Sequence, residues 1–183
     1  MTAPEPTPQE KALKRVLAVS RLNGWSVVVI AGLGALVALL LGDLVGVFVG
    51  LLAAAAGWME VRGHRMLRRR DAAGMTWLVR SQLFLLSVIL VYCITRLGSF
   101  DADTAMSNLT PDMETMLKES GVTRGDILPL VRTAFLATYL SFAGVSTLYQ
   151  GGMALYYRGK TRLVTEALTA PPVPPALPTQ SVY

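Results

Sequence analysis

Four polar side chains interrupt one apolar stretch of this sequence, where they could form an ion path or a buried polar network. Arg80, Gln82, Tyr92 and Arg96 all fall within residues 76–98. Charged and hydrogen-bonding side chains inside a membrane are costly, and they usually mark a transport path or a paired network. Their spacing does not place all four on one face of a helix. The pattern therefore makes them candidate permeation or polar-network residues without defining a continuous polar stripe.

Acidic side chains are even rarer inside the apolar stretches. Glu60 and Arg80 are expected near neighbouring ends of two helices, where they could pair with each other or with the basic loop. Asp43 is expected in a turn, and Arg96 can extend its side chain to reach lipid headgroups. Small proton-coupled exporters need a carboxylate midway through the membrane, and no acidic residue is expected at that depth in this chain. The sequence therefore disfavours that class of transporter.

Groups suited to catalysis or metal binding are few. The chain has one cysteine, Cys93, and one histidine, His64, so an intramolecular disulfide and a histidine-rich metal site are both excluded. No nucleophile with a neighbouring base is evident in the sequence. We therefore expect a non-enzymatic protein that needs no metal or other cofactor.

An arginine-rich segment, WMEVRGHRMLRRRD at residues 58–71, contrasts with the apolar chain around it. Such a segment could bind nucleic acid, bind anionic lipid headgroups, or fix the orientation of a membrane protein. The chain is 52% hydrophobic and its cations flank apolar stretches, so we expect no nucleic-acid partner. The residues predicted to fix orientation and to contact anionic lipids are Arg62, Arg65, Arg68, Arg69 and Arg70.

The long uncharged stretches predict an all-α integral membrane protein with four transmembrane helices, arranged as two antiparallel hairpins. Residues 23–61 contain no cation, and one helix of that length would be about twice as long as the bilayer core is thick. Gly42–Asp43 is the turn signal within this stretch, so we expect it to fold back as transmembrane helices 1 and 2. Residues 76–98 and 127–158 are predicted to be transmembrane helices 3 and 4.

The remaining segments are polar. Residues 1–22 are predicted to contain an amphipathic helix, capped by Thr7, that either lies on the membrane or extends helix 1. Residues 62–75 are predicted to be a basic loop, and residues 99–126 an acidic loop with a short amphipathic helix. Residues 159–183 are predicted to be a proline-rich tail, which could bind a protein partner.

The distribution of charge predicts an orientation. If the chain crosses the membrane four times, thirteen of its seventeen cations fall on one side. Trp25, Trp58 and Trp77 fall at that same end of their helices, as expected for rings that prefer the membrane interface. Cationic loops stay on the cytoplasmic side. We therefore expect a multi-pass protein of a bacterial inner membrane, with both termini and the basic loop in the cytoplasm and the acidic loop outside it.

Small residues recur at helical spacing and would let helices approach closely in lipid. In helices 1 and 2 they favour packing of the hairpin on itself, and a contact between subunits is the alternative. In helix 4 they form a seam for a tight helix partner. The predicted helix-packing residues are Gly42, Gly46, Gly50, Ala137, Ser141, Gly144 and Gly151.

Two functions remain open on these grounds. The first is a homo-oligomeric channel or pore-like assembly, because one four-helix chain is too small to hold a wide pore and several copies could enclose one. The second is a membrane-anchored scaffold, assembly factor or accessory subunit, which the long final helix and the proline-rich tail favour. The lipid bilayer and its anionic lipids are the expected partners in either case.

Overall fold

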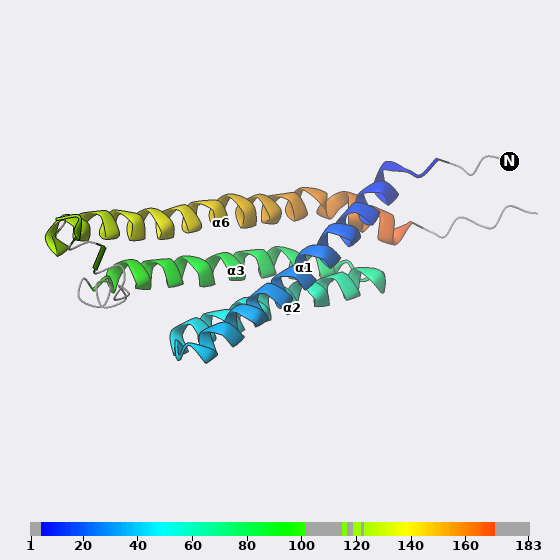
Figure 1. Cartoon of the computed structure of the whole chain (residues 1–183). Coiled ribbons are helices and arrows are strands. Elements are labelled where there is room, and N and C mark those ends of the chain that lie inside the picture. Colours follow the sequence, from blue (N-terminus) through cyan, green and yellow to red (C-terminus); the bar gives the residue numbers. More distant parts are fainter. Residues whose placement is uncertain (1–4, 102–114, 117–118, 122, 171–183) are drawn as a thin grey trace, which may run out of the picture.

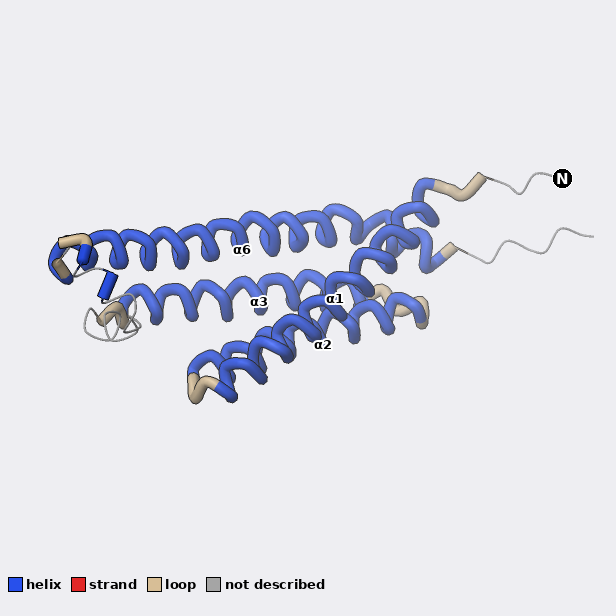
Figure 2. Tube along the Cα trace, viewed as in Figure 1, coloured by secondary structure: helices blue, strands red, loops and turns tan. Residues whose placement is uncertain are grey.

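The computed structural model describes residues 5–101, 115–116, 119–121 and 123–170, and this part of the chain is helical, without strands. Four long helices and their short connections account for nearly all of it (Figures 1 and 2). They are α1 (Pro8–Leu40), α2 (Leu44–Arg68), α3 (Ala73–Gly98) and α6 (Arg124–Thr169). The short helix predicted in the acidic loop lies largely outside the described residues.

Each of the four helices is long and apolar enough to cross a membrane. The shortest, α2, has 25 residues and is therefore about 38 Å long, against about 30 Å for the hydrocarbon core of a bilayer. The prediction of an all-α fold with four helices that could span a membrane is confirmed for the described residues. Helices α1 and α6, with 33 and 46 residues, are longer than a single crossing of the membrane requires.

The first helix is continuous. Thr7 caps it as predicted, with its hydroxyl accepting a hydrogen bond from the Glu10 amide while the Glu10 carboxylate accepts one from the Thr7 amide. The helix then runs without a break to Leu40, so the amphipathic segment extends the first span. Ala12, Val16 and Ser20 are buried at four-residue intervals, which shows that this face packs on the bundle.

The turn between α1 and α2 lies where the sequence predicted it. Gly42 has a φ of +73°, a conformation that glycine adopts without a steric cost. The Asp43 carboxylate then accepts a hydrogen bond from the amide of Gly46 at 3.0 Å and so caps α2. This tight turn makes α1 and α2 an antiparallel hairpin (Figure 1).

The basic segment is mostly helical, whereas the sequence predicted a loop over residues 62–75. Helix α2 continues to Arg68 and ends in a Schellman motif, in which the amide of Asp71 bonds to the carbonyl of Met66 and the amide of Arg70 to that of Leu67. Arg70 takes the left-handed position of this motif, with a φ of +61°, where glycine is usual. Only four residues, 69–72, connect α2 to α3.

Helix α6 differs from the prediction at both ends. It begins at Arg124 with a capping box between Thr123 and Asp126, so Pro129 lies inside the helix and not in its first turn as predicted. It ends at Thr169, eleven residues past the predicted boundary at 158. The described part of the predicted tail is therefore helix.

The four helices converge at one end of the bundle. This end carries Arg62, Arg65 and Arg68–Arg70 together with the start of α1 and the end of α6, and we call it the arginine end (Figure 1). A hydrophobic core lies there, with contributions from all four helices. Its buried members are Val16, Leu67, Met75, Leu78, Tyr157, Val164 and Leu168.

Away from that core, the helices separate into two pairs. Towards the end that carries the α1–α2 turn, here called the turn end, α1 and α2 diverge from α3 and α6 (Figure 1). The α3–α6 pair is held by aromatic contacts, with ring centroids of Tyr92 and Tyr139 at 6.0 Å and of Phe100 and Phe135 at 5.0 Å. Each pair therefore has its own seam, and the pairs are joined chiefly at the arginine end.

Candidate functional site

A buried polar cluster draws one or more side chains from every helix. The Glu60 carboxylate of α2 accepts hydrogen bonds from Asn23 Nδ2 of α1 at 2.7 Å, Gln82 Nε2 of α3 at 2.8 Å and the Tyr157 hydroxyl of α6 at 2.6 Å. The Tyr149 hydroxyl of α6 donates to Asn23 Oδ1 at 2.8 Å. These five residues, which we call the Glu60 cluster, lie where the two helix pairs meet.

The Glu60 cluster holds a carboxylate without a cationic partner among the described residues. All three donors to Glu60 are neutral, and none of the ion pairs in the described part of the chain includes Glu60. Of the partners that the sequence allowed for Glu60, Arg80 is not the one used, because Glu60 is 1% exposed whereas Arg80 lies at the surface. The amide oxygen of the equally buried Gln82 has no hydrogen-bond partner.

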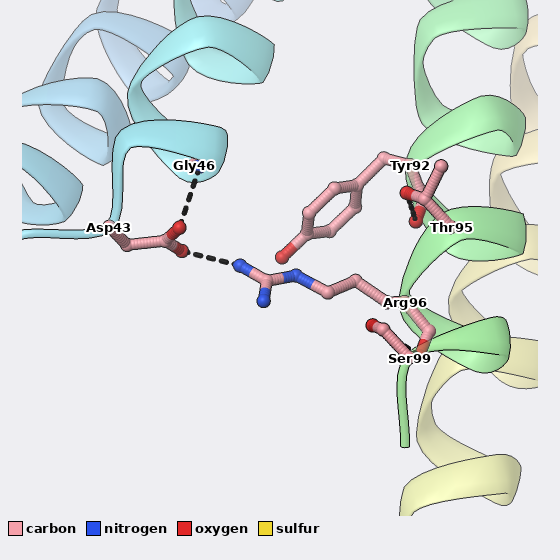
Figure 3. Close-up of polar contacts among 6 residues, drawn as sticks. All are labelled: Asp43, Gly46, Tyr92, Thr95, Arg96 and Ser99. Carbon is pink, nitrogen blue, oxygen red and sulfur yellow. Dashed lines mark hydrogen bonds and ion pairs between the residues drawn. The ribbon is translucent and has the colours of Figure 1, made fainter. Parts of the chain in front are cut away.

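An ion pair connects the two helix pairs at the turn end. Arg96 Nη2 of α3 lies 2.6 Å from Asp43 Oδ2 in the α1–α2 turn (Figure 3). The Arg96 guanidinium also lies 5.4 Å from the centre of the Tyr92 ring, which projects into the same space (Figure 3). The sequence predicted that Arg96 would reach lipid headgroups; the structure directs it across the bundle to Asp43.

An apolar cleft of about 470 Å³ lies between the two helix pairs. Small residues of α1 and α2 line one side of it, and Leu85, Ile89, Tyr92 and Phe142 contribute the other. Asp43 is the one charged residue in its lining. The volume is in the range of pockets that hold small molecules or lipid chains.

The four candidate permeation residues do not share one space. Gln82 is part of the Glu60 cluster, and Tyr92 and Arg96 lie together at the turn end. Arg80 is exposed two residues before Gln82. The structure thus assigns them to three separate environments.

The five arginines predicted to contact lipid are all exposed. Two of them lie over tryptophan rings at the arginine end: Arg62 is 4.6 Å from the ring centre of Trp77, and Arg65 is 5.1 Å from that of Trp58. Arg70 Nη1 donates to the carbonyl of Ala170 at 3.4 Å. The guanidinium groups of Arg62 and Arg65 are therefore held beside rings of the kind that favour the membrane interface.

The predicted helix-packing residues fall into three groups. A Cβ on Gly46 or Gly50 would lie 2.9 Å from Ala38 or 2.8 Å from Ala35, so these glycines allow the close approach of α1 and α2. Gly42 lies in the turn and has no such contact. No described part of another helix covers the seam on α6, which consists of Ala137, Ser141, Gly144 and Gly151.

Sequence reasoning missed Asn23, Tyr149 and Tyr157 as members of the Glu60 cluster. Tyr157 lies near the arginine end of α6, where the sequence alone would suit an interface aromatic, but it is fully buried and donates to Glu60. Asn23 carried a signal, because it is the polar residue at the start of the first uncharged stretch. Nothing in the sequence links it to residues on three other helices.

Comparison with known proteins adds no relative. No protein-family model, no curated protein and no solved structure matches this chain. The interpretation of the Glu60 cluster, the Asp43–Arg96 ion pair and the apolar cleft therefore rests on their own geometry.

Proposed function

We propose that this chain is a non-enzymatic membrane protein that binds a lipid, holding an acyl chain in the apolar cleft between its two helix pairs. The cleft is the observation that carries the proposal. Its position between membrane-spanning helices makes acyl chains the most concentrated apolar molecules within reach. A lipid-binding accessory or scaffold subunit is the role that this favours.

Packing energetics support an occupant for the cleft. Apolar walls without a neighbour lose dispersion contacts, and an acyl chain would restore them. Gly34 illustrates this, because it lines the cleft and no atom of another residue lies within 4 Å of the Cβ it would carry. The flexible methylene chain of a lipid suits a lining made of alanine, glycine and branched aliphatic side chains.

A pair of glycine substitutions tests the proposal. Leucine at Gly34 places a branched side chain in the cleft and obstructs it, whereas leucine at Gly32, which does not line the cleft and has equally open surroundings, serves as the control. We expect native mass spectrometry to detect about one retained phospholipid per wild-type and Gly32→Leu chain and none for Gly34→Leu. Equal lipid retention in both variants would contradict the proposal.

The same protein is proposed to sit in a bacterial inner membrane with the arginine end in the cytoplasm. The bias of thirteen cations in seventeen supports this orientation, as do the arginine–tryptophan contacts at that end. Arg62, Arg65 and Arg68–Arg70 would then face the anionic headgroups of the inner leaflet. Reporter fusions to both termini test the orientation, and an active periplasmic reporter at either terminus would contradict it.

A homo-oligomeric channel is the second candidate, and the uncovered seam on α6 is the observation that favours it. Ala137, Ser141 and Gly144 are exposed along one side of this helix, where a second copy could approach closely. The mass of the protein in mild detergent tests this assembly. Four or more copies, reduced to single chains by Gly144→Leu, would support it, and a single wild-type chain would exclude a pore between subunits.

A further inference from the structure

We propose that the Glu60 cluster is a binding site for one small monovalent cation, either a proton or Na⁺, and that the cation is bound at the Glu60 carboxylate. This inference does not depend on the lipid that the cleft is proposed to hold. It rests on the burial of Glu60, on the neutrality of its partners, and on an amide oxygen that the cluster leaves unused.

The first argument concerns charge. An ionised carboxylate removed from water needs a compensating charge, because neutral hydrogen-bond donors replace only part of its hydration. Glu60 receives three donors, from Asn23, Gln82 and Tyr157, and all three are neutral. A bound cation would neutralise the cluster without the need for a cationic side chain.

The second argument concerns the ligands that a cation would use. Gln82 is 1% exposed and its Oε1 has no partner, although its Nε2 bonds to Glu60. Rotation of this amide exchanges a donor for an acceptor at the carboxylate. The oxygen could then coordinate Na⁺ beside Glu60, or accept the hydrogen bond of a proton added to Glu60 from water. The buried Gln150 offers another unpartnered amide oxygen on α6, two turns before Tyr157.

Among the charged and titratable groups around the cluster, Glu60 is the one placed to bind the cation. On α1, Arg21 is exposed, and on α3, Arg80 is exposed. On α2 itself, His64 lies one turn beyond Glu60, and its Nδ1 is 3.1 Å from the Ser20 hydroxyl. On α6, the titratable groups are the phenols of Tyr149, Tyr156 and Tyr157, and Arg158 is exposed. The hydrogen bonds that the carboxylate accepts from the described part of the chain thus all come from neutral groups.

Thermal unfolding in detergent tests the site. Wild type, Glu60→Gln and Glu166→Gln are compared with NaCl exchanged for choline chloride at constant ionic strength, and then across pH in choline chloride. Glu166 is a matched carboxylate at the surface, paired with Arg162 outside the cluster. If Na⁺ is the ligand, Na⁺ at about ten times its Kd raises the melting temperature of wild type and Glu166→Gln by about 3–6 °C and leaves Glu60→Gln unchanged.

If a proton is the ligand, Na⁺ has no effect, and the melting temperature of wild type relative to Glu60→Gln falls as the pH rises. Infrared difference spectra then contain the carbonyl band of a protonated carboxylic acid, and this band is absent from Glu60→Gln. Should Glu60→Gln fail to fold, Gln82→Leu replaces it and is expected to weaken the Na⁺ or pH response about tenfold. The proposal would be overturned if the melting temperature of wild type responded to neither Na⁺ nor pH. It would also be overturned if Glu60→Gln responded as strongly as wild type.

Discussion

Arg96 Nη2 and Asp43 Oδ2 are 2.6 Å apart, and this ion pair bridges the two helix pairs at the end of the bundle where they otherwise diverge. The two side chains are 30% and 37% exposed, so each keeps contact with its surroundings while spanning the gap. Both helices that they join already have their own tightly packed partner. The ion pair therefore spans the opening between the α1–α2 hairpin and the α3–α6 pair, beside the cleft that Asp43 helps to line.

Loss of this ion pair is expected to widen the cleft. Asp43→Asn keeps a side-chain oxygen to cap α2 and removes only the charge, and Arg96→Gln is the matched change on α3. We expect each to cost about 1 kcal/mol, as is usual for partly exposed pairs. Spin-label distances between the α1–α2 turn and the end of α3 should become longer and broader. Unchanged distances in both variants would show that the pair does not restrain the opening.

Glycine contacts within the first hairpin give a second prediction. A Cβ at Gly50 would lie 2.8–3.0 Å from atoms of Ala35, including backbone atoms that cannot move aside. Gly50→Ala should therefore destabilise the protein by about 1–3 kcal/mol. Gly159 lies in α6 with open space around it, so Gly159→Ala should be neutral or stabilising by up to about 1 kcal/mol. Thermal unfolding in detergent compares the two, and equal effects would contradict the close packing of α1 on α2.

The left-handed conformation of Arg70 gives a third prediction. A side chain at a φ of +61° costs roughly 1–2 kcal/mol relative to the right-handed region, and glycine avoids most of this cost. Arg70→Gly should raise the melting temperature by roughly 2–4 °C. Arg69 has a φ of −86°, so Arg69→Gly should give no such gain. A lower melting temperature for Arg70→Gly would mean that the bond from Arg70 to Ala170 outweighs the strain.

The exposed arginines give a fourth prediction. Each cation near an anionic membrane surface contributes about 1 kcal/mol to binding. Replacing Arg68, Arg69 and Arg70 with glutamine should therefore weaken the retention of anionic phospholipid by about two orders of magnitude, as measured by lipid exchange into the purified protein. Retention of zwitterionic phospholipid should be unaffected. An equal loss of both lipid classes would point to misfolding instead of headgroup recognition.

The sequence predicted the features that depend on local chemistry. The capping box at Thr7, the turn at Gly42 and the apolar length of each helix are all encoded within short windows. The Glu60 cluster could not be predicted in this way, because Glu60 and Tyr157 are 97 positions apart and meet only through packing of α2 on α6. The extension of α2 and α6 was also missed, since polar residues past a membrane span look the same in a helix and in a loop.

The divergence of the hairpins has a similar cause. Gly46 and Gly50 predict that α1 and α2 approach closely, but they do not predict that this pair stays apart from α3 and α6 at the turn end. In the structure, Tyr139 of α6 packs on Tyr92 of α3, and Phe135 packs on Phe100, just after the end of α3. The cleft lies where the α1–α2 hairpin and the α3–α6 pair, each packed within itself, face each other without close contact.

Electron paramagnetic resonance of a phospholipid labelled on its acyl chain shows whether the cleft holds an acyl chain. The labelled lipid is titrated into the purified protein in detergent. We expect an immobilised component that saturates at one lipid per chain, is lost in Gly34→Leu and remains in Gly32→Leu. An immobilised component that never saturates, or that Gly34→Leu leaves intact, would contradict a lipid-binding cleft.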